Sequence, residues 1–111
     1  MHEPKARRRP RAEIEGIKAR TRANDFVLSS HADLEAADEE IGIEEIREAI
    51  LNADMLEHYE DTGRGESCLL LGFVNDRPIH VICGWRHESV LVITVYIPKP
   101  PKFINPWTRR R

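Results

Sequence analysis

Three apolar runs of strand length dominate the second half of the chain, between Glu66 and Ile97. They read ESCLLLGF, PIHVICGW and VLVITVYI, and short polar segments around Asn75-Asp76 and Arg86–Ser89 separate them. Val, Ile, Leu and aromatic residues favour strands, whereas Asn, Asp and Ser favour tight turns. The pattern therefore predicts a three-stranded antiparallel meander that the rest of the chain covers or extends.

Helical spacing characterises the segments that precede these strands, where apolar residues recur at intervals typical of one helix face. The positions are Ile14 and Ile17, then Leu34, Ala37 and Ile41, then Ile43, Ile46, Ile50 and Leu51. Ser30 is the expected N-cap of the second helix, and residues 55–59 are a candidate for one more strand. The predicted fold is α+β: two or three short N-terminal helices packed on one face of a three- to four-stranded antiparallel sheet.

Strand side chains alternate between the two faces of a sheet, so the loop lengths decide which residues face the helices. With a three-residue loop, Asn75-Asp76-Arg77, all odd-numbered positions share one apolar face, which we assign to the helices. His80 and Tyr96 then lie side by side on a partly open, even-numbered face. Cys68 and Cys83 lie on opposite faces and cannot form a disulfide. A loop with an even number of residues would break this arrangement. The residues predicted to be in the core are Ile46, Leu71, Val81 and Ile93.

Length and composition narrow the class of protein. A chain of 111 residues corresponds to one domain, and without about eighteen consecutive apolar residues we expect no membrane span. The basic N-terminus lacks the apolar segment of a secretory signal. Two cysteines without CxxC spacing indicate neither a zinc site nor a disulfide framework. A reducing, cytoplasmic location is therefore the expectation.

The net charge of −2 conceals an uneven distribution. Residues 1–22 carry eight Lys and Arg against three acids, residues 33–66 carry thirteen acids, and residues 99–111 carry five Lys and Arg and no acid. We divide the chain into a disordered basic arm (1–11), a single α+β domain (12–98) and a Pro-rich basic tail (99–111). The basic ends could contact phosphate backbones; alternatively, they only solubilise the chain.

Four side chains have the chemistry for a site: His31, His80, Tyr96 and Arg64. A histidine exchanges a proton near neutral pH, a tyrosine hydroxyl donates a hydrogen bond, and an arginine binds phosphate bidentately. Together they would suffice for metal-independent RNA cleavage, in which the ribose 2′-hydroxyl attacks the adjacent phosphorus.

Each of these residues also has a purely structural interpretation. His31 could serve local hydrogen bonding after the Ser-Ser pair, and His80 could be a satisfied sheet residue. Tyr96 could pack at a strand end, and Arg64 could be solvated. His, Cys, Asp and Glu show no metal-ligand spacing, and we expect no cofactor.

Five segments together resemble the bacterial family DUF4258 over roughly residues 12–98. They are LSSHA (28–32), IGIEEIREAI (41–50), GRGESCLLLGF (63–73), RPIHVICG (77–84) and VLVITVYIP (90–98). That family is similar to RelE-like and MqsR-like toxins, with the barnase–EndoU–colicin–RelE type of fold. The resemblance implies that His31, His80 and Tyr96 are catalytic and that Arg64 binds phosphate.

By this resemblance the chain is a toxin-like, metal-independent endoribonuclease, with RNA as substrate and a protein antitoxin as partner. One departure concerns the helix after His31, where similar sequences place arginine. Here the helix reads ADLEAADEE, which would repel RNA unless its acids face away from the site. The alternative is a non-enzymatic binding module that uses its open sheet face or edge.

Overall fold

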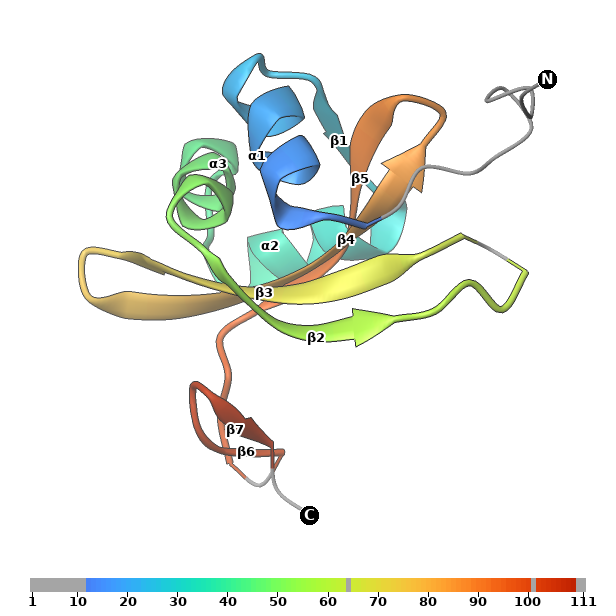
Figure 1. Ribbon diagram of the computed structural model, residues 1–111. Helices are drawn as coiled ribbons and strands as arrows, with labels where there is room; N and C mark the ends of the chain where they lie inside the picture. Colours follow the sequence, from blue (N-terminus) through green and yellow to red (C-terminus); the bar gives the residue numbers. More distant parts are fainter. Residues whose placement is uncertain (1–11, 64, 101, 110–111) are drawn as a thin grey trace, which may run out of the picture.

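Three helices and a five-stranded sheet form the body of the computed structural model, which describes residues 12–63, 65–100 and 102–109 (Figure 1). The helices are α1 (Ile14–Arg22), α2 (Ser30–Asp38) and α3 (Ile43–Leu51). The strands are β1 (Phe26–Leu28), β2 (Asp54–Tyr59), β3 (Ser67–Val74), β4 (Arg77–Arg86), β5 (Ser89–Tyr96), β6 (Phe103–Asn105) and β7 (Thr108–Arg109). The predicted α+β class is confirmed.

The sheet is larger than predicted and has the order β1-β5-β4-β3-β2. Its four longer strands are antiparallel, and β1 adds a parallel edge beside β5. The Val90 amide donates to the Asp25 carbonyl and the Ser29 amide donates to the Val92 carbonyl, so the short segment between α1 and α2 is held in the sheet. A run of only three residues was too short to predict as a strand.

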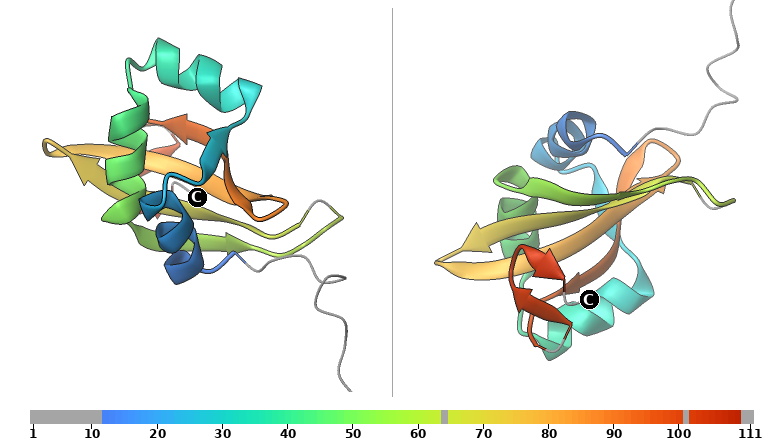
Figure 2. Two further views of the ribbon diagram at one scale, coloured as in Figure 1. Left: turned by 90° about the horizontal axis from the view of Figure 1, so that it is seen from above. Right: turned by 60° about the horizontal axis from the view of Figure 1, so that its bottom comes forward.

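The helices occupy one side of the sheet and a small hairpin, β6–β7, lies on the other (Figures 1 and 2). The face toward the helices is called the inner face below, and the opposite one the outer face. Ile46 and Val81 are fully buried in the core between sheet and helices, as predicted. Gly72 lets α3 approach β3 closely, because a Cβ atom there would lie 1.9 Å from the Ala49 carbonyl oxygen.

The assignment of odd positions to the inner face is wrong for β3 and half of β5. The turn between β3 and β4 contains two residues, Asn75 and Asp76, both with positive φ, as in the tight turns that match strand twist. Its even length reverses the parity of β3 relative to β4. Cys68, Leu70 and Val74 therefore join the inner core, and the outer residues of β3 are Leu69, Leu71 and Phe73.

A second two-residue turn and a bulge fix the faces of β5. Arg86 pairs with Ser89 around the turn, so Val90 and Val92 point inward. The register then shifts between Ile82 and Cys83 of β4, which returns Val95 to the inner face. Among the residues predicted to be in the core, Leu71 is buried but on the outer face, and Ile93 is only partly buried.

The two cysteines share the inner face, contrary to the prediction. Cys68 pairs directly with Cys83 across β3 and β4, and both are buried, free thiols. Burial raises the pKa of Cys68 to about 12 and holds the pKa of Cys83 well above its usual value. Both side chains therefore behave as small apolar core residues.

The C-terminal segment is also more ordered than a disordered basic tail would be. Phe103 is buried, and β6 and β7 pair with each other as a separate two-stranded sheet. The Phe73 and Trp107 rings lie 5.7 Å apart, which ties the hairpin to the outer face of β3. The described residues of the C-terminal segment therefore add packing contacts to the outer face. The arm 1–11 lies outside the described part of the chain.

Candidate functional site

His80 lies at the centre of the outer face and has no exposed surface. It pairs with Tyr96 across β4 and β5, which confirms the prediction that these two residues lie side by side. The His80 Nδ1 atom lies 3.2 Å from the Tyr96 hydroxyl, and Nε2 lies 2.7 Å from the Pro106 carbonyl oxygen. A carbonyl can only accept, so Nε2 carries the hydrogen and Nδ1 accepts from Tyr96.

Aromatic rings enclose the same histidine. The Phe103 ring meets the His80 ring edge to face at 4.4 Å, and the Tyr96 ring lies 5.2 Å from it. The Lys102 ammonium lies 5.8 Å from the centre of the Tyr96 ring. Side chains of β4, β5 and β6 thus close this half of the outer face around the His80 imidazole.

Glu57 and Arg109 form a bidentate ion pair at the border of this cluster. The Arg109 Nη2 and Nε atoms donate to the two carboxylate oxygens at 2.8 and 3.0 Å, and the Tyr59 hydroxyl also donates to Glu57. The Arg109 hydrogen bonds hold the pKa of Glu57 below its usual range, while burial opposes this shift. Burial and the bond to Glu57 raise the pKa of Tyr59 to about 12.

Sequence reasoning missed Glu57 and Arg109. The register of β2 shifts between Met55 and Glu57, which places Glu57 and Tyr59 on the outer face. This bulge also explains why residues 55–59 do not alternate cleanly in the sequence. The spacing of Glu57 and Tyr59, two positions apart, was the one sequence signal that both side chains share a face. No local pattern in the sequence connects Glu57 to Arg109.

The pKa of His80 is lowered, mainly because burial disfavours the charged imidazolium. The Arg109 charge lowers it further, whereas the Pro106 carbonyl and the Glu57 charge raise it. Burial also raises the pKa of Tyr96, so its hydroxyl stays protonated at neutral pH. Both groups are therefore neutral in this structure.

We expect the folded protein to lose stability as the pH falls below about 6.5, because its unfolded form binds a proton at His80 more readily. The contribution of His80 is fully present above its unfolded pKa and declines below it. Urea denaturation at several pH values measures the effect. A His80→Gln variant should show a smaller decline in this window, and an equal decline would contradict the assignment. Glu57 acts only at lower pH, because its lowered pKa starts from 4.5.

The structure does not bring His31 to this cluster. Its side chain is 68% exposed in the first turn of α2, and its Nε2 atom lies 3.3 Å from Glu35. Ser29, rather than Ser30, caps this helix: its hydroxyl accepts from the Ala32 amide and donates to the Ile93 carbonyl. Glu35 also accepts from the Val95 amide, so it secures the β5 edge next to Tyr96. Arg64 lies outside the described residues.

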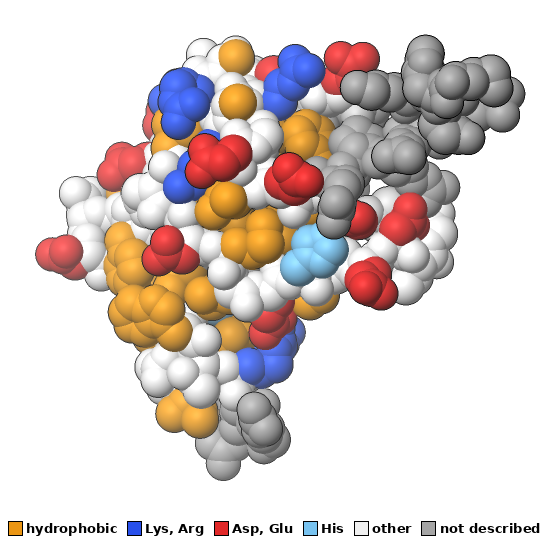
Figure 3. Space-filling view, in the orientation of Figure 1, with side chains coloured by type: hydrophobic (Ala, Val, Ile, Leu, Met, Phe, Trp, Pro, Cys, Tyr) orange, Lys and Arg blue, Asp and Glu red, His pale blue; other side chains and the backbone are white. Residues whose placement is uncertain are grey.

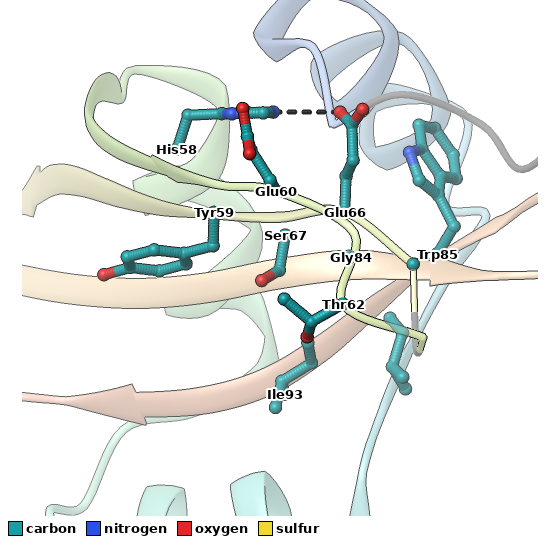
Figure 4. Close-up of a pocket in the computed structure, with 11 residues that line it drawn as sticks. His58, Tyr59, Glu60, Thr62, Glu66, Ser67, Gly84, Trp85 and Ile93 are labelled. Carbon is teal, nitrogen blue, oxygen red and sulfur yellow. Dashed lines mark hydrogen bonds and ion pairs between the residues drawn. The ribbon is translucent and has the colours of Figure 1, made fainter.

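An open pocket of about 560 Å³ occupies the other half of the outer face, beneath the β2–β3 loop. Tyr59, Ser67, Gly84 and Ile93 line it (Figure 4). His58 bonds to Glu66 at 2.9 Å along its upper rim. Among the lining residues that the structure describes, none is Lys or Arg. The pocket therefore suits a neutral, partly apolar group better than a phosphate.

No three His, Cys, Asp or Glu side chains gather as metal ligands within the described ranges. None of the described helices is long and apolar enough to cross a membrane.

The fold and the outer face define a small α+β domain that carries a cluster of titratable side chains on the sheet face away from its helices. The model of the family described as "Domain of unknown function (DUF4258)" matches residues 28–97, more than half of the chain. The chain belongs to this family, as the sequence predicted. No curated protein and no solved structure matches it.

Proposed function

We propose that this protein is a toxin-like, metal-independent endoribonuclease whose site is the outer face of the sheet. One observation carries the proposal: His80, Tyr96 and Glu57 come from three different strands to one face and form a single electrostatic cluster. A histidine and a carboxylate can serve as the acid and the base in general acid–base cleavage of RNA. The resemblance to RelE-like and MqsR-like toxins points to the same reaction.

In the proposed reaction, the Glu57 carboxylate takes the proton of a ribose 2′-hydroxyl. The 2′-oxygen then forms a bond to the adjacent phosphorus, and the bond from phosphorus to the 5′-oxygen breaks. Protonated His80 gives its proton to that leaving oxygen, and the products are a 2′,3′-cyclic phosphate and a free 5′-hydroxyl. While His80 is protonated, the Tyr96 oxygen accepts from Nδ1–H and positions the ring, so the hydroxyl hydrogen can donate to a charged phosphate oxygen.

The test uses a single-stranded RNA oligonucleotide, the full-length protein and a Phe103→Ala variant, which removes the ring against His80. We expect the variant to cleave the RNA with a 2′,3′-cyclic phosphate end, at a rate that EDTA does not change. A 2′-deoxy nucleotide at the cleaved position should block the reaction. Cleavage of that deoxy substrate, or none of RNA by either protein, would contradict the proposal.

The second candidate is a non-enzymatic binding module, and the burial of His80 favours it. Both ring nitrogens already have protein partners, and the outer face already receives a two-stranded hairpin. Charge does not single out a nucleic-acid surface, since Figure 3 shows Lys, Arg, Asp and Glu interspersed among the described residues in view. A protein partner of this kind would present a hairpin with an apolar ring to the face. A cytoplasmic antitoxin would be such a partner whether the protein is a ribonuclease or a binding module.

A further inference from the structure

The hairpin β6–β7 stands apart from the rest of the domain in three ways. It follows the family-matched segment 28–97 in the sequence. It pairs only with itself, so its backbone does not extend the ladder of the main sheet. Pro98 and Pro100 lie in the connection from β5, where their fixed φ angles separate the two units. The hairpin thus lies outside both the main sheet and the segment that the family model matches.

Side-chain contacts, together with the bond from His80 to the Pro106 carbonyl, attach this element to the sheet, at the border seen below β3 in Figure 1. Phe103 packs on His80, Arg109 pairs with Glu57, and Trp107 lies on Phe73. Figure 3 shows hydrophobic side chains gathered where the hairpin meets the sheet. The attachment therefore covers the two residues to which we assign acid and base roles.

We propose that residues 102–109 form an intramolecular cover that keeps the outer face closed and opens without unfolding of the domain. That the cover inhibits RNA cleavage rests on the proposed function. That the cover opens does not depend on the proposed function. An isolated two-stranded hairpin has marginal stability, and elements with few buried contacts open locally more often than the core. The inner core does not depend on Phe103, whose ring packs on the opposite face.

Opening would also prepare the two groups for catalysis. When Arg109 leaves, Glu57 loses the hydrogen bonds that most lower its pKa, and it becomes a stronger base. When Phe103 and Pro106 leave, water reaches His80, and the burial that most lowers its pKa is relieved. The imidazole then holds a proton more readily at neutral pH, as a general acid must. The same contacts that close the face thus keep His80 neutral and make Glu57 a weaker base.

The test measures the reaction of individual histidines with diethyl pyrocarbonate by peptide mass spectrometry in the full-length protein. His31, whose side chain is 68% exposed, is the internal control for the reagent and the reaction conditions in the same molecule. We expect His80 to react slowly in the wild type and at least tenfold faster in Phe103→Ala and in Arg109→Gln. Ile104→Ala is the matched control, because this neighbouring side chain is 61% exposed and should leave the rate unchanged.

Low concentrations of urea separate local opening from unfolding. If the cover opens locally, the rate at His80 should stay nearly constant in urea well below the unfolding transition. A rate that rises steeply with urea in every protein, or one that is equal in the wild type and both cover variants, would overturn the inference. RNA cleavage is then compared in the same proteins, and we expect at least a tenfold rise in both cover variants. Faster modification of His80 without cleavage would leave the cover standing and remove the ribonuclease proposal. Equal cleavage by open and closed proteins would leave the ribonuclease proposal standing and show that the cover does not inhibit the reaction.

Discussion

RNA cleavage by the Phe103→Ala protein should fall about 10²–10⁴-fold when His80 is replaced by Ala. That range is typical of the loss of one positioned acid–base group. The imidazole is the only titrating ring in direct contact with Tyr96 within the described cluster, so no neighbour can substitute for it. Initial rates on the single-stranded oligonucleotide, measured at saturating protein, give the comparison directly.

Two further substitutions sharpen this experiment. Tyr96→Phe should also lower cleavage substantially, because it removes the hydroxyl that holds Nδ1 while leaving the ring. His87→Asn is the matched control: His87 is an exposed turn residue with φ of 56°, a conformation that Asn tolerates. A loss in His87→Asn equal to that in His80→Ala would show that the effect is not specific to the site. Because the closed structure buries His80, circular dichroism should accompany each assay to verify folding.

Gly72→Ala should cost about 3 kcal/mol or more of unfolding free energy, beyond the usual range for overpacking a core. The new Cβ would lie 1.9 Å from the Ala49 carbonyl oxygen and 2.5 Å from its carbon. These are backbone atoms of α3, so no side-chain rotation can relieve the overlap. The helix would have to move away from β3 and weaken the core. Urea denaturation followed by circular dichroism measures the difference.

Gly16→Ala is the matched control for this prediction. Its Cβ would meet only the Trp85 ring, at 3.8 Å, which is ordinary contact. Since Gly16 lies within α1, alanine should leave stability unchanged or raise it by up to about 1 kcal/mol. If Gly72→Ala were as stable as Gly16→Ala, the close packing of α3 on β3 would be wrong.

The sequence by itself determined the α+β class, the meander and the position of most helices, because these depend on local hydrophobic periodicity. The helices and the strands of the meander are each encoded within runs of about ten residues or fewer. The sequence also placed His80 beside Tyr96, but that pairing depends on the bulge in β5, which offsets the even-numbered turn between β4 and β5. The family match follows from several such local segments in the expected order.

Only the tertiary structure decided which face each strand presents and what covers the outer face. The two-residue turn at Asn75-Asp76 and the bulges in β2 and β5 each reverse which positions face the helices. One residue more or less at such a point moves every following side chain of the strand to the other face. The contact of Arg109 with Glu57 joins residues 52 positions apart. Such a contact leaves no periodic signal in the sequence, since it depends on how the completed sheet and the hairpin pack against each other.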